Sequence, residues 1–219
     1  METNWDQLIK NKFSENMNSG SVCCDVGACN GIFTDFFKNI TGIEGMVYSF
    51  ELNVFNYKNL LRLNSDNCIC ENLAISDKEE MMDVYSDNEQ SGNHISNIVG
   101  HDTAFRKMKS IGKVKSISLD EYFKNKNVDY IKIDVEGAEL KVIKGGIETL
   151  KKCKLVIIEC HYDDDWKEIC QVLNDNNLKF KNLVNDEFVD YGSYQQIPGR
   201  SSIGRPYQMY LINKTQSGD

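Results

Sequence analysis

A glycine-containing turn between a predicted strand and a predicted helix constrains the fold of this chain more than any other feature. It lies in residues 22–34, Val-Cys-Cys-Asp-Val-Gly-Ala-Cys-Asn-Gly-Ile-Phe-Thr. Gly27 and Gly31 would let the backbone approach a ligand and let the helix pack against a sheet. A strand, a glycine turn and a helix in this order predict the first unit of an α/β domain that binds its ligand at the turn.

The charge at this turn distinguishes between nucleotide ligands. A dinucleotide site uses the pattern Gly-x-Gly-x-x-Gly, which places a pyrophosphate at the helix N-terminus. The pattern here is Asp-x-Gly-x-x-x-Gly, and Asp25 would face a pyrophosphate as a like charge. S-adenosylmethionine (SAM) carries an ammonium and a sulfonium, which a carboxylate attracts. The turn therefore favours SAM over NAD, and an NAD-dependent oxidoreductase on the same fold is the alternative.

Strand and helix patterns alternate along the 219 residues and predict a mostly parallel, doubly wound sheet with helices on both faces. We see no linker or repeat, so residues 1–219 are expected to form one domain, with an N-terminal helix within residues 1–20. Other helices are expected at 32–41, 55–63 and 166–178, with Ile32 and Leu61 facing the core. A short helix is expected to start at 118–122, and the strand at 128–134 is expected to lead into a helix that carries Leu140, Val142 and Ile143. Strands are expected at 21–25, 45–51, 67–75 with a hairpin partner at 81–85, 128–134 and 154–161, and as a final antiparallel pair at 180–189 and 208–213.

Two polar segments are candidate substrate loops. Residues 86–112 are rich in Ser, Asn and Gly and contain His94 and His101, which we interpret as loop residues rather than ligands. Residues 190–207 contain four side chains that could cover a polar acceptor. These are Tyr191, Tyr194, Arg200 and Arg205.

The overall charge and the apolar pattern limit the partners. The chain has 25 Lys and Arg against 33 Asp and Glu, a net charge of −8. This makes nucleic acid an unlikely partner, although an RNA methyltransferase stays an alternative if the 190–207 loop forms a basic groove. No apolar run approaches the ~20 residues of a membrane helix, and the start lacks the apolar segment of a signal peptide. The 8 cysteines lack zinc-type spacing, so we expect reduced thiols in a soluble, cytoplasmic protein without membrane contact.

Polar residues follow the predicted strands at the edge where an open α/β sheet binds its ligand. Glu51 ends the second strand about 20 residues after the turn, where a ribose-binding acid is expected, and its carboxylate could accept both ribose hydroxyls. The alternative is a solvated acid at a strand end. The other strand-end residues are Asp25, Asn72, Ala74, Asp134, Glu159 and His161.

Four motifs together resemble the FkbM-type SAM-dependent methyltransferases, over about Val22 to His161. They are Asp25-Val-Gly-Ala-Cys-Asn-Gly31, Phe50-Glu51-Leu52-Asn53, Asn72-Leu-Ala74-Ile-Ser-Asp77 and, most specifically, Lys132-Ile-Asp-Val-Glu-Gly-Ala-Glu139. The resemblance implies a Rossmann-like class I methyltransferase fold with a seven-stranded sheet of order 3-2-1-4-5-7-6. It also implies methyl transfer to a hydroxyl oxygen, often of a sugar or natural product.

The resemblance also implies roles for individual residues. Glu51 would bind the ribose, and Asp134 would lie close to the sulfonium and the incoming acceptor. The glycine turn would surround the methionine part, and a further group would border the adenine. The turn residues are Asp25, Gly27, Ala28, Cys29, Asn30 and Gly31, and the adenine group is Leu52, Asn72 and Ala74.

Removal of the acceptor proton needs a base within hydrogen-bond reach, and Asp134 and His161 are the candidates. A lone histidine is often structural, and we expect a base at His161 to titrate near pH ~6.5. Glu136 and Glu139 are either part of this site or acids that favour a helix N-terminus. Lys132 either pairs with one of these acids or points out of its strand.

The need for a metal ion is open from the sequence. Asp163, Asp164 and Asp165 are interpreted as a solvated helix start, and the alternative is a magnesium site that they form with Asp134. We expect no obligate divalent ion. The sequence thus predicts a SAM-dependent O-methyltransferase for a small hydroxylated acceptor, with a sugar first among the candidates. A non-catalytic SAM-binding module is the remaining rival.

Overall fold

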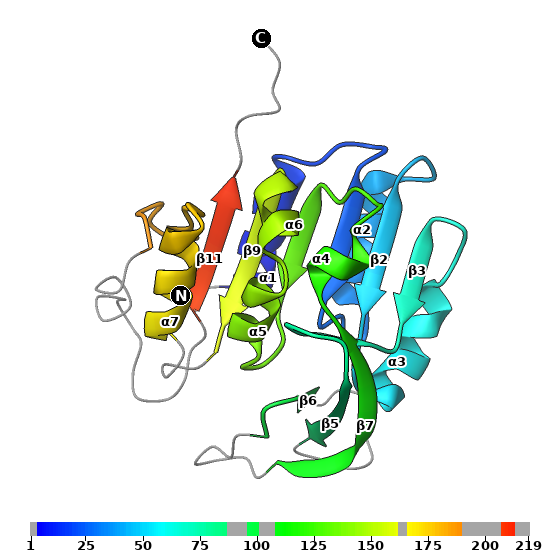
Figure 1. Cartoon of the computed structure of the whole chain (residues 1–219). Coiled ribbons are helices and arrows are strands. Elements are labelled where there is room, and N and C mark those ends of the chain that lie inside the picture. The colour runs from blue at the N-terminus through cyan, green and yellow to red at the C-terminus, as the bar shows by residue number, and fades with distance from the viewer. Residues whose placement is uncertain (1–3, 87–95, 101–107, 162–165, 190–206, 213–219) are drawn as a thin grey trace.

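The centre of the computed structural model is a seven-stranded sheet, within the residues that the structure describes, 4–86, 96–100, 108–161, 166–189 and 207–212. The strands lie in the order β10-β11-β9-β8-β1-β2-β3 (Figure 1). Their bounds are β1 (Val22–Val26), β2 (Met46–Phe50), β3 (Cys68–Glu71), β8 (Tyr130–Ile133), β9 (Leu155–Cys160), β10 (Lys181–Asn182) and β11 (Tyr207–Ile212).

The sheet is mixed. β1, β2, β3, β8 and β9 pair in parallel, whereas β11 runs antiparallel to both β9 and β10. Counted along the chain within this sheet, the strands therefore lie in the order 3-2-1-4-5-7-6. The register places Val26 beside Phe50 and Ile133, so that Gly27, Glu51 and Asp134 follow at one edge of the sheet.

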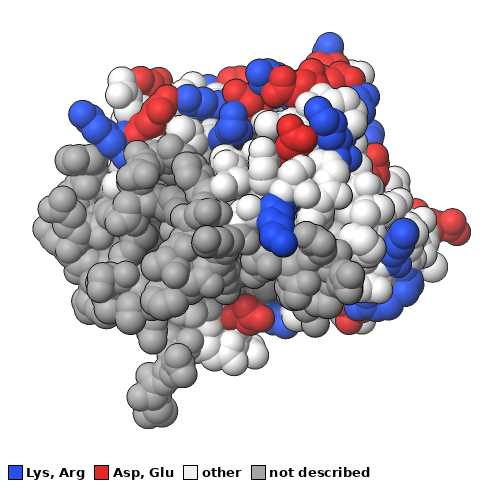
Figure 2. Space-filling model, turned by 90° about the horizontal axis from the view of Figure 1, so that it is seen from below, with Lys and Arg blue, Asp and Glu red and all other residues white. Residues whose placement is uncertain are grey.

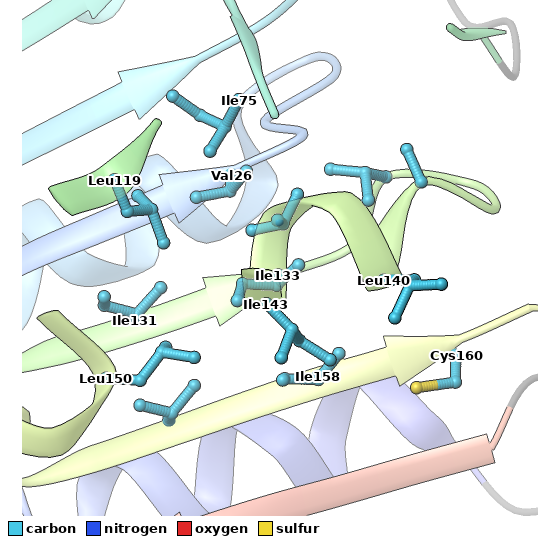
Figure 3. Close-up of a cluster of buried hydrophobic side chains, with 14 of the residues drawn as sticks. Val26, Ile75, Leu119, Ile131, Ile133, Leu140, Ile143, Leu150, Ile158 and Cys160 are labelled. Carbon is cyan, nitrogen blue, oxygen red and sulfur yellow. The ribbon is translucent and has the colours of Figure 1, made fainter. Parts of the chain in front are cut away.

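Helices on both faces of the sheet enclose two apolar cores, because successive strand residues point to opposite faces. Cys23 belongs to one core and Cys24 to the other. The first core packs against α1 (Trp5–Ser14), α2 (Ile32–Thr41) and α3 (Val54–Leu60) with its 3₁₀ turn Leu61–Leu63. The second packs against α4 (Leu119–Tyr122), α5 (Glu139–Lys144), α6 (Ile147–Lys152) and α7 (Trp166–Asp175), and Figure 3 shows part of it.

Side chains at the helix starts explain where several helices begin. The Asn4 side chain accepts a hydrogen bond from the Gln7 backbone N–H, and Asn53 and Ser118 cap α3 and α4 in the same manner. Such caps satisfy backbone N–H groups that have no partner within the helix. None of the described helices has the length and apolar character that a membrane span requires.

The chain between β3 and α4 forms a second, four-stranded sheet. This sheet lies beyond the carboxyl ends of the parallel strands (Figure 1). Its order is β4-β7-β5-β6, with β4 (Ala74–Ile75) parallel to β7 (Lys109–Ile117). β5 (Met81–Ser86) runs antiparallel to β7 and to β6 (Ser96–Asn97). Residues in and next to its strands β4 and β6 line one side of a cavity at the carboxyl edge of the central sheet.

Several elements differ from those expected from the sequence. The single strand expected at 67–75 is two strands, β3 and β4, in different sheets. The expected hairpin between 67–75 and 81–85 is absent from the described residues, because 81–85 pairs with β7. Part of the expected loop 86–112 is strand. The helix that carries Leu140, Val142 and Ile143 is α5, and α6, which follows Gly145 and Gly146, was not expected. Ile32 and Leu61, expected in the core, are exposed.

The eight cysteines are free thiols, as expected. Some expectations fall on residues outside the described part of the chain. These are His94, His101, Asp163, Asp164, Asp165, Tyr191, Tyr194, Arg200 and Arg205.

Candidate active site

A cavity opens at the carboxyl edge of the parallel strands, against the second sheet. It contains about 690 Å³ of space between the atoms, part of it open to solvent. The segments that follow β1, β2 and β8 line one side, and β4 and β6 with their neighbours line the other. The lining residues are Val26, Gly27, Cys29, Phe50, Glu51, Leu52, Asn56, Leu73, Ala74, Ile75, Ser96, Ile98, Asp134, Val135, Glu136 and Ala138.

The glycine turn is held tightly between β2 and β8. The backbone N–H groups of Gly27 and Ala28 both donate to the Phe50 carbonyl, at 3.0 and 2.9 Å. Gly27 has φ of 83°, and a Cβ there would lie 1.8 Å from the Asp134 carbonyl oxygen. Only glycine therefore permits this approach between the turn and the end of β8.

Gly31 serves a different purpose from Gly27. It precedes α2 with φ of 86°, and a Cβ there would meet the side chains of Leu60 and Leu63. It is not among the residues that line the cavity. Gly31 thus allows α2 to pack beside α3 and its 3₁₀ turn.

The structure brings together six of the predicted cofactor residues and places five others outside the lining. Gly27, Cys29, Glu51, Leu52, Ala74 and Asp134 line the cavity, whereas Asp25, Ala28, Asn30, Gly31 and Asn72 do not. Asp25 is buried below the turn, where it accepts a hydrogen bond from Thr34 Oγ1 at 2.7 Å and burial raises its pKa. The Asn72 amide donates to the carbonyls of Glu51 and Leu52, so it shapes one wall from behind.

Glu51 is a buried carboxylate in the cavity wall. Its Oε2 accepts a hydrogen bond from the Cys29 backbone N–H and its Oε1 from that of Asn53, both at 2.7 Å. The side chain is nearly inaccessible, at 4% exposure, and burial raises its pKa to about 7 although the two N–H groups oppose this shift. Each carboxylate oxygen can accept a further hydrogen bond, so Glu51 is suited to bind a pair of hydroxyls.

Asp134 is paired with a buried lysine. Lys132 Nζ lies 2.9 Å from Asp134 Oδ2 and 4.6 Å from the centre of the Phe33 ring. Burial alone would raise the pKa of Asp134, but the charges of Lys132 and His161 outweigh it and hold this pKa below its ordinary value. The buried atom Asp134 Oδ1 has no hydrogen-bond partner among the described residues.

His161 lies among four carboxylates. Its Nδ1 is 2.9 Å from Glu139 Oε1, and its Nε2 is 3.4 Å from Glu136, 3.7 Å from Asp134 and 3.8 Å from Glu159. Burial disfavours its positive charge, but the Glu139 hydrogen bond and the surrounding carboxylates raise its pKa to about 10. His161 is therefore an imidazolium at neutral pH, which corrects the expected titration near ~6.5.

Glu136 and Glu139 are parts of this cluster and not solvated acids at a helix start. Glu139 is buried at 3% exposure and accepts a hydrogen bond from the Gly137 backbone N–H at 3.0 Å. Glu136 lines the cavity, and its backbone is in the left-handed region with φ of 54°. Burial raises the pKa of Glu136 to about 7, against the charge of His161.

Asp134, Glu136 and His161 each offer one oxygen or nitrogen within 4.8 Å of the others, the one such cluster found in the described part of the chain. A divalent cation there would have to displace the proton that His161 holds with a pKa of about 10. The imidazolium already supplies positive charge to these carboxylates.

Residues of the second sheet complete the cavity, and sequence reasoning did not single them out. Ser96 and Ile98 line it, and Ser96 Oγ accepts a hydrogen bond from the Asn53 amide at 2.8 Å. Asn97 Nδ2 donates to the Glu136 carbonyl at 3.0 Å. The one signal for these residues was their place in the polar segment 86–112.

The fold is shared with solved structures of methyltransferases. Among solved structures, a Methyltransferase FkbM from Methylobacillus flagellatus KT superposes with a TM-score of 0.57 over 91% of this chain and 46% of that one. A putative rRNA-methylase from Clostridium thermocellum superposes with a TM-score of 0.54 over 97% of each chain. Sequence identity is 13% in both cases, so these likenesses show the fold alone.

The sequence comparison is more specific. The Methyltransferase FkbM domain profile matches residues 25–181, and the chain therefore belongs to the FkbM methyltransferase family. A stretch of 68 residues is 37% identical to the hexuronic acid methyltransferase AglP of Haloferax volcanii. That stretch covers 30% of this chain and 28% of the relative, so the chain matches well under half of that protein.

Proposed function

We propose that this protein transfers the methyl group of SAM to a hydroxyl oxygen of a small acceptor, with a sugar or glycan as the first candidate. The observation that carries the proposal is the Glu51 carboxylate. It is buried in the cavity wall at the end of β2, and two backbone N–H groups fix both of its oxygens. This arrangement suits the two hydroxyls of an adenosine ribose.

The remaining walls fit the other parts of SAM. Leu52, Leu73 and Ile98 offer apolar surface for an adenine ring beside Glu51. Gly27 of the turn and Asp134 next to it line another part of the cavity, where the Asp134 carboxylate would favour the sulfonium. The buried Asp134 Oδ1 without a hydrogen-bond partner marks a place where a ligand group would complete the site.

The catalytic residue that we propose is Asp134, and His161, which is not among the residues that line the cavity, is a positioning residue beside it. When bound, SAM supplies a methyl group on a positively charged sulfur. Lys132 keeps Asp134 ionised and fixed, so its carboxylate would stabilise the sulfonium and orient the acceptor hydroxyl. His161, as an imidazolium, would hold the carboxylates of Glu136 and Glu139 in place. Alignment of donor and acceptor would supply much of the rate.

The sugar acceptor is supported by one relative and by the charge distribution. AglP is named as a hexuronic acid methyltransferase, which favours a sugar here. The described Lys and Arg side chains at this end of the molecule are scattered among acidic ones (Figure 2) and form no single basic patch there. An RNA acceptor is therefore the second candidate, supported by similarity of fold to an rRNA-methylase.

Calorimetry and a transfer assay test this proposal. SAM should bind with micromolar or tighter affinity, and NADH and a short RNA should bind at least about a hundredfold more weakly, a difference of about 2.7 kcal/mol. Radiolabelled methyl from SAM should then appear on at least one of four 4-nitrophenyl glycosides: glucoside, galactoside, mannoside and glucuronide. Binding of NADH but not SAM would refute the cofactor, and transfer to RNA alone would refute the acceptor.

A further inference from the structure

Glu136 is a cavity residue to which the proposed function gives no chemical role of its own. It lies two residues beyond Asp134 and shares the wall where donor and acceptor would meet. We propose that Glu136 is the general base that accepts the acceptor's hydroxyl proton during methyl transfer. This inference rests on the proposed SAM-dependent transfer and adds a catalytic residue to it.

The backbone of Glu136, a residue that lines the cavity, has an unfavourable conformation. Its φ of 54° is costly for a residue with a Cβ, and the next residue, Gly137, has φ of 107°. Asn97 Nδ2 donates to the Glu136 carbonyl, and Asn97 Oδ1 accepts from the N–H groups of Val99 and Gly100. Strain of this kind is found at functional sites and persists because surrounding contacts enforce it.

Neither of the other two candidates is as well placed to accept a proton. His161 already carries a proton at neutral pH because four carboxylates surround it. Asp134 is held by Lys132 at 2.9 Å, and a carboxylate stabilised in this way is a weak base. Glu136 lines the cavity with its side chain about one quarter exposed, so its carboxylate is accessible to an acceptor.

The groups around Glu136 adjust its basicity. His161, which follows β9, faces it at 3.4 Å and stabilises its charge, whereas three other carboxylates and burial oppose that charge. Those carboxylates come from β8, β9 and α5, and they are Asp134, Glu159 and Glu139. The resulting pKa of about 7 is close to the operating pH that general base catalysis requires.

The step is balanced without a further reactant. The acceptor oxygen forms its bond to the methyl carbon as the carbon–sulfur bond breaks, and the electron pair of that bond remains on sulfur. The hydroxyl proton passes to the Glu136 carboxylate. Glu136 then returns the proton to bulk water before the next turnover.

The variant Glu136→Gln tests this role, with Glu44→Gln as a control because Glu44 is exposed, precedes the amino end of β2 and does not line the cavity at the carboxyl edge. With the fastest glycoside of the four-compound panel, Glu136→Gln should lower kcat by roughly 10²–10⁴-fold. SAM affinity by calorimetry should change less than about threefold. In ¹³C-glutamate-labelled protein, the carboxyl signals of Glu51 and Glu136 should both titrate near pH 7, and only the Glu136 signal should be absent from the variant.

A second variant distinguishes loss of the base from loss of the folded structure. Glu136→Gly suits the positive φ, so it should fold, and added formate should restore part of its activity. Retention of more than a third of the wild-type kcat by Glu136→Gln would overturn the inference and leave the proposed function standing. A tenfold loss of SAM affinity, or a Glu136 signal that titrates near pH 4.5, would also overturn it. Absence of SAM binding or methyl transfer in the wild-type protein would instead refute the proposed function itself.

Discussion

Adenosine binding should weaken as the pH falls below 7, because the proposed ribose site depends on the ionised form of Glu51. Its pKa of about 7 means that protons compete with the ribose hydroxyls for the carboxylate. If only the carboxylate form binds, the apparent Kd rises by a factor of 1 + 10^(pKa − pH), which is about 1.1 at pH 8 and about 11 at pH 6. The corresponding loss of binding free energy is about 1.4 kcal/mol.

Calorimetry with adenosine between pH 5.5 and 8.5 measures this effect, since adenosine has the ribose and lacks the titratable amino acid part of SAM. The variant Glu51→Gln should bind more weakly by roughly 1.5–3 kcal/mol and lose the pH dependence. Glu136→Gln should keep it, which separates the two groups whose pKa is about 7. A constant affinity for adenosine over this range in the folded wild-type protein would refute the assignment of Glu51 to the ribose.

The remaining predictions concern the turn, the paired carboxylate and metal. Gly27→Ala should lower the free energy of unfolding by roughly 2–5 kcal/mol, since its Cβ would overlap the Asp134 carbonyl. The control Gly20→Ala, with a similar φ and open space around the Cβ, should lower it by about 1–2 kcal/mol. Equal losses for the two variants in urea unfolding would contradict this. Asp134→Asn should reduce kcat at least about 10²-fold with a modest loss of SAM affinity, and normal turnover would place the chemistry elsewhere. Methyl transfer should persist after dialysis against EDTA; loss on chelation with recovery in magnesium would show a metal requirement.

The main architecture follows from patterns that are local in the sequence. Apolar strand runs, the helix spacing of α1 and α2 and the polar strand ends were sufficient to predict the elements of the central sheet. The final antiparallel pair was also predicted, with bounds that the structure shortens at 181–182. These signals are strong because each depends on the burial of one face of one element.

The second sheet was harder to predict because its main strand is half exposed. β7 has the sequence Lys-Ser-Ile-Gly-Lys-Val-Lys-Ser-Ile, and only Val114 and Ser116 of it are buried. The strand begins inside a polar segment and contains Gly112, which weakened the strand signal. Its pairing with β5 is a long-range contact that no local pattern shows.

Residues of the candidate site could be named from the sequence, but the pKa shifts within it could not. Strand-end reasoning found Glu51, Asp134 and His161. The pKa of His161 depends on Glu139 at the start of α5 and on Asp134 and Glu136 after β8, which packing brings next to the end of β9. Sequence position alone therefore suggested an ordinary histidine base, whereas the folded protein has an imidazolium there.

The two walls of the cavity come from different parts of the chain, joined by the Asn97–Glu136 and Asn53–Ser96 hydrogen bonds. The central sheet supplies the turn, Glu51 and Asp134, and the β4–β7 sheet is an insertion between β3 and α4 that supplies Ser96, Asn97 and Ile98. Substitution of Ile98 by another apolar residue would thus alter one wall while the hydrogen bonds that Ser96 and Asn97 make to the other wall stay in place. An evolving lineage could acquire new acceptors in this way while the methyl-donor machinery stays constant.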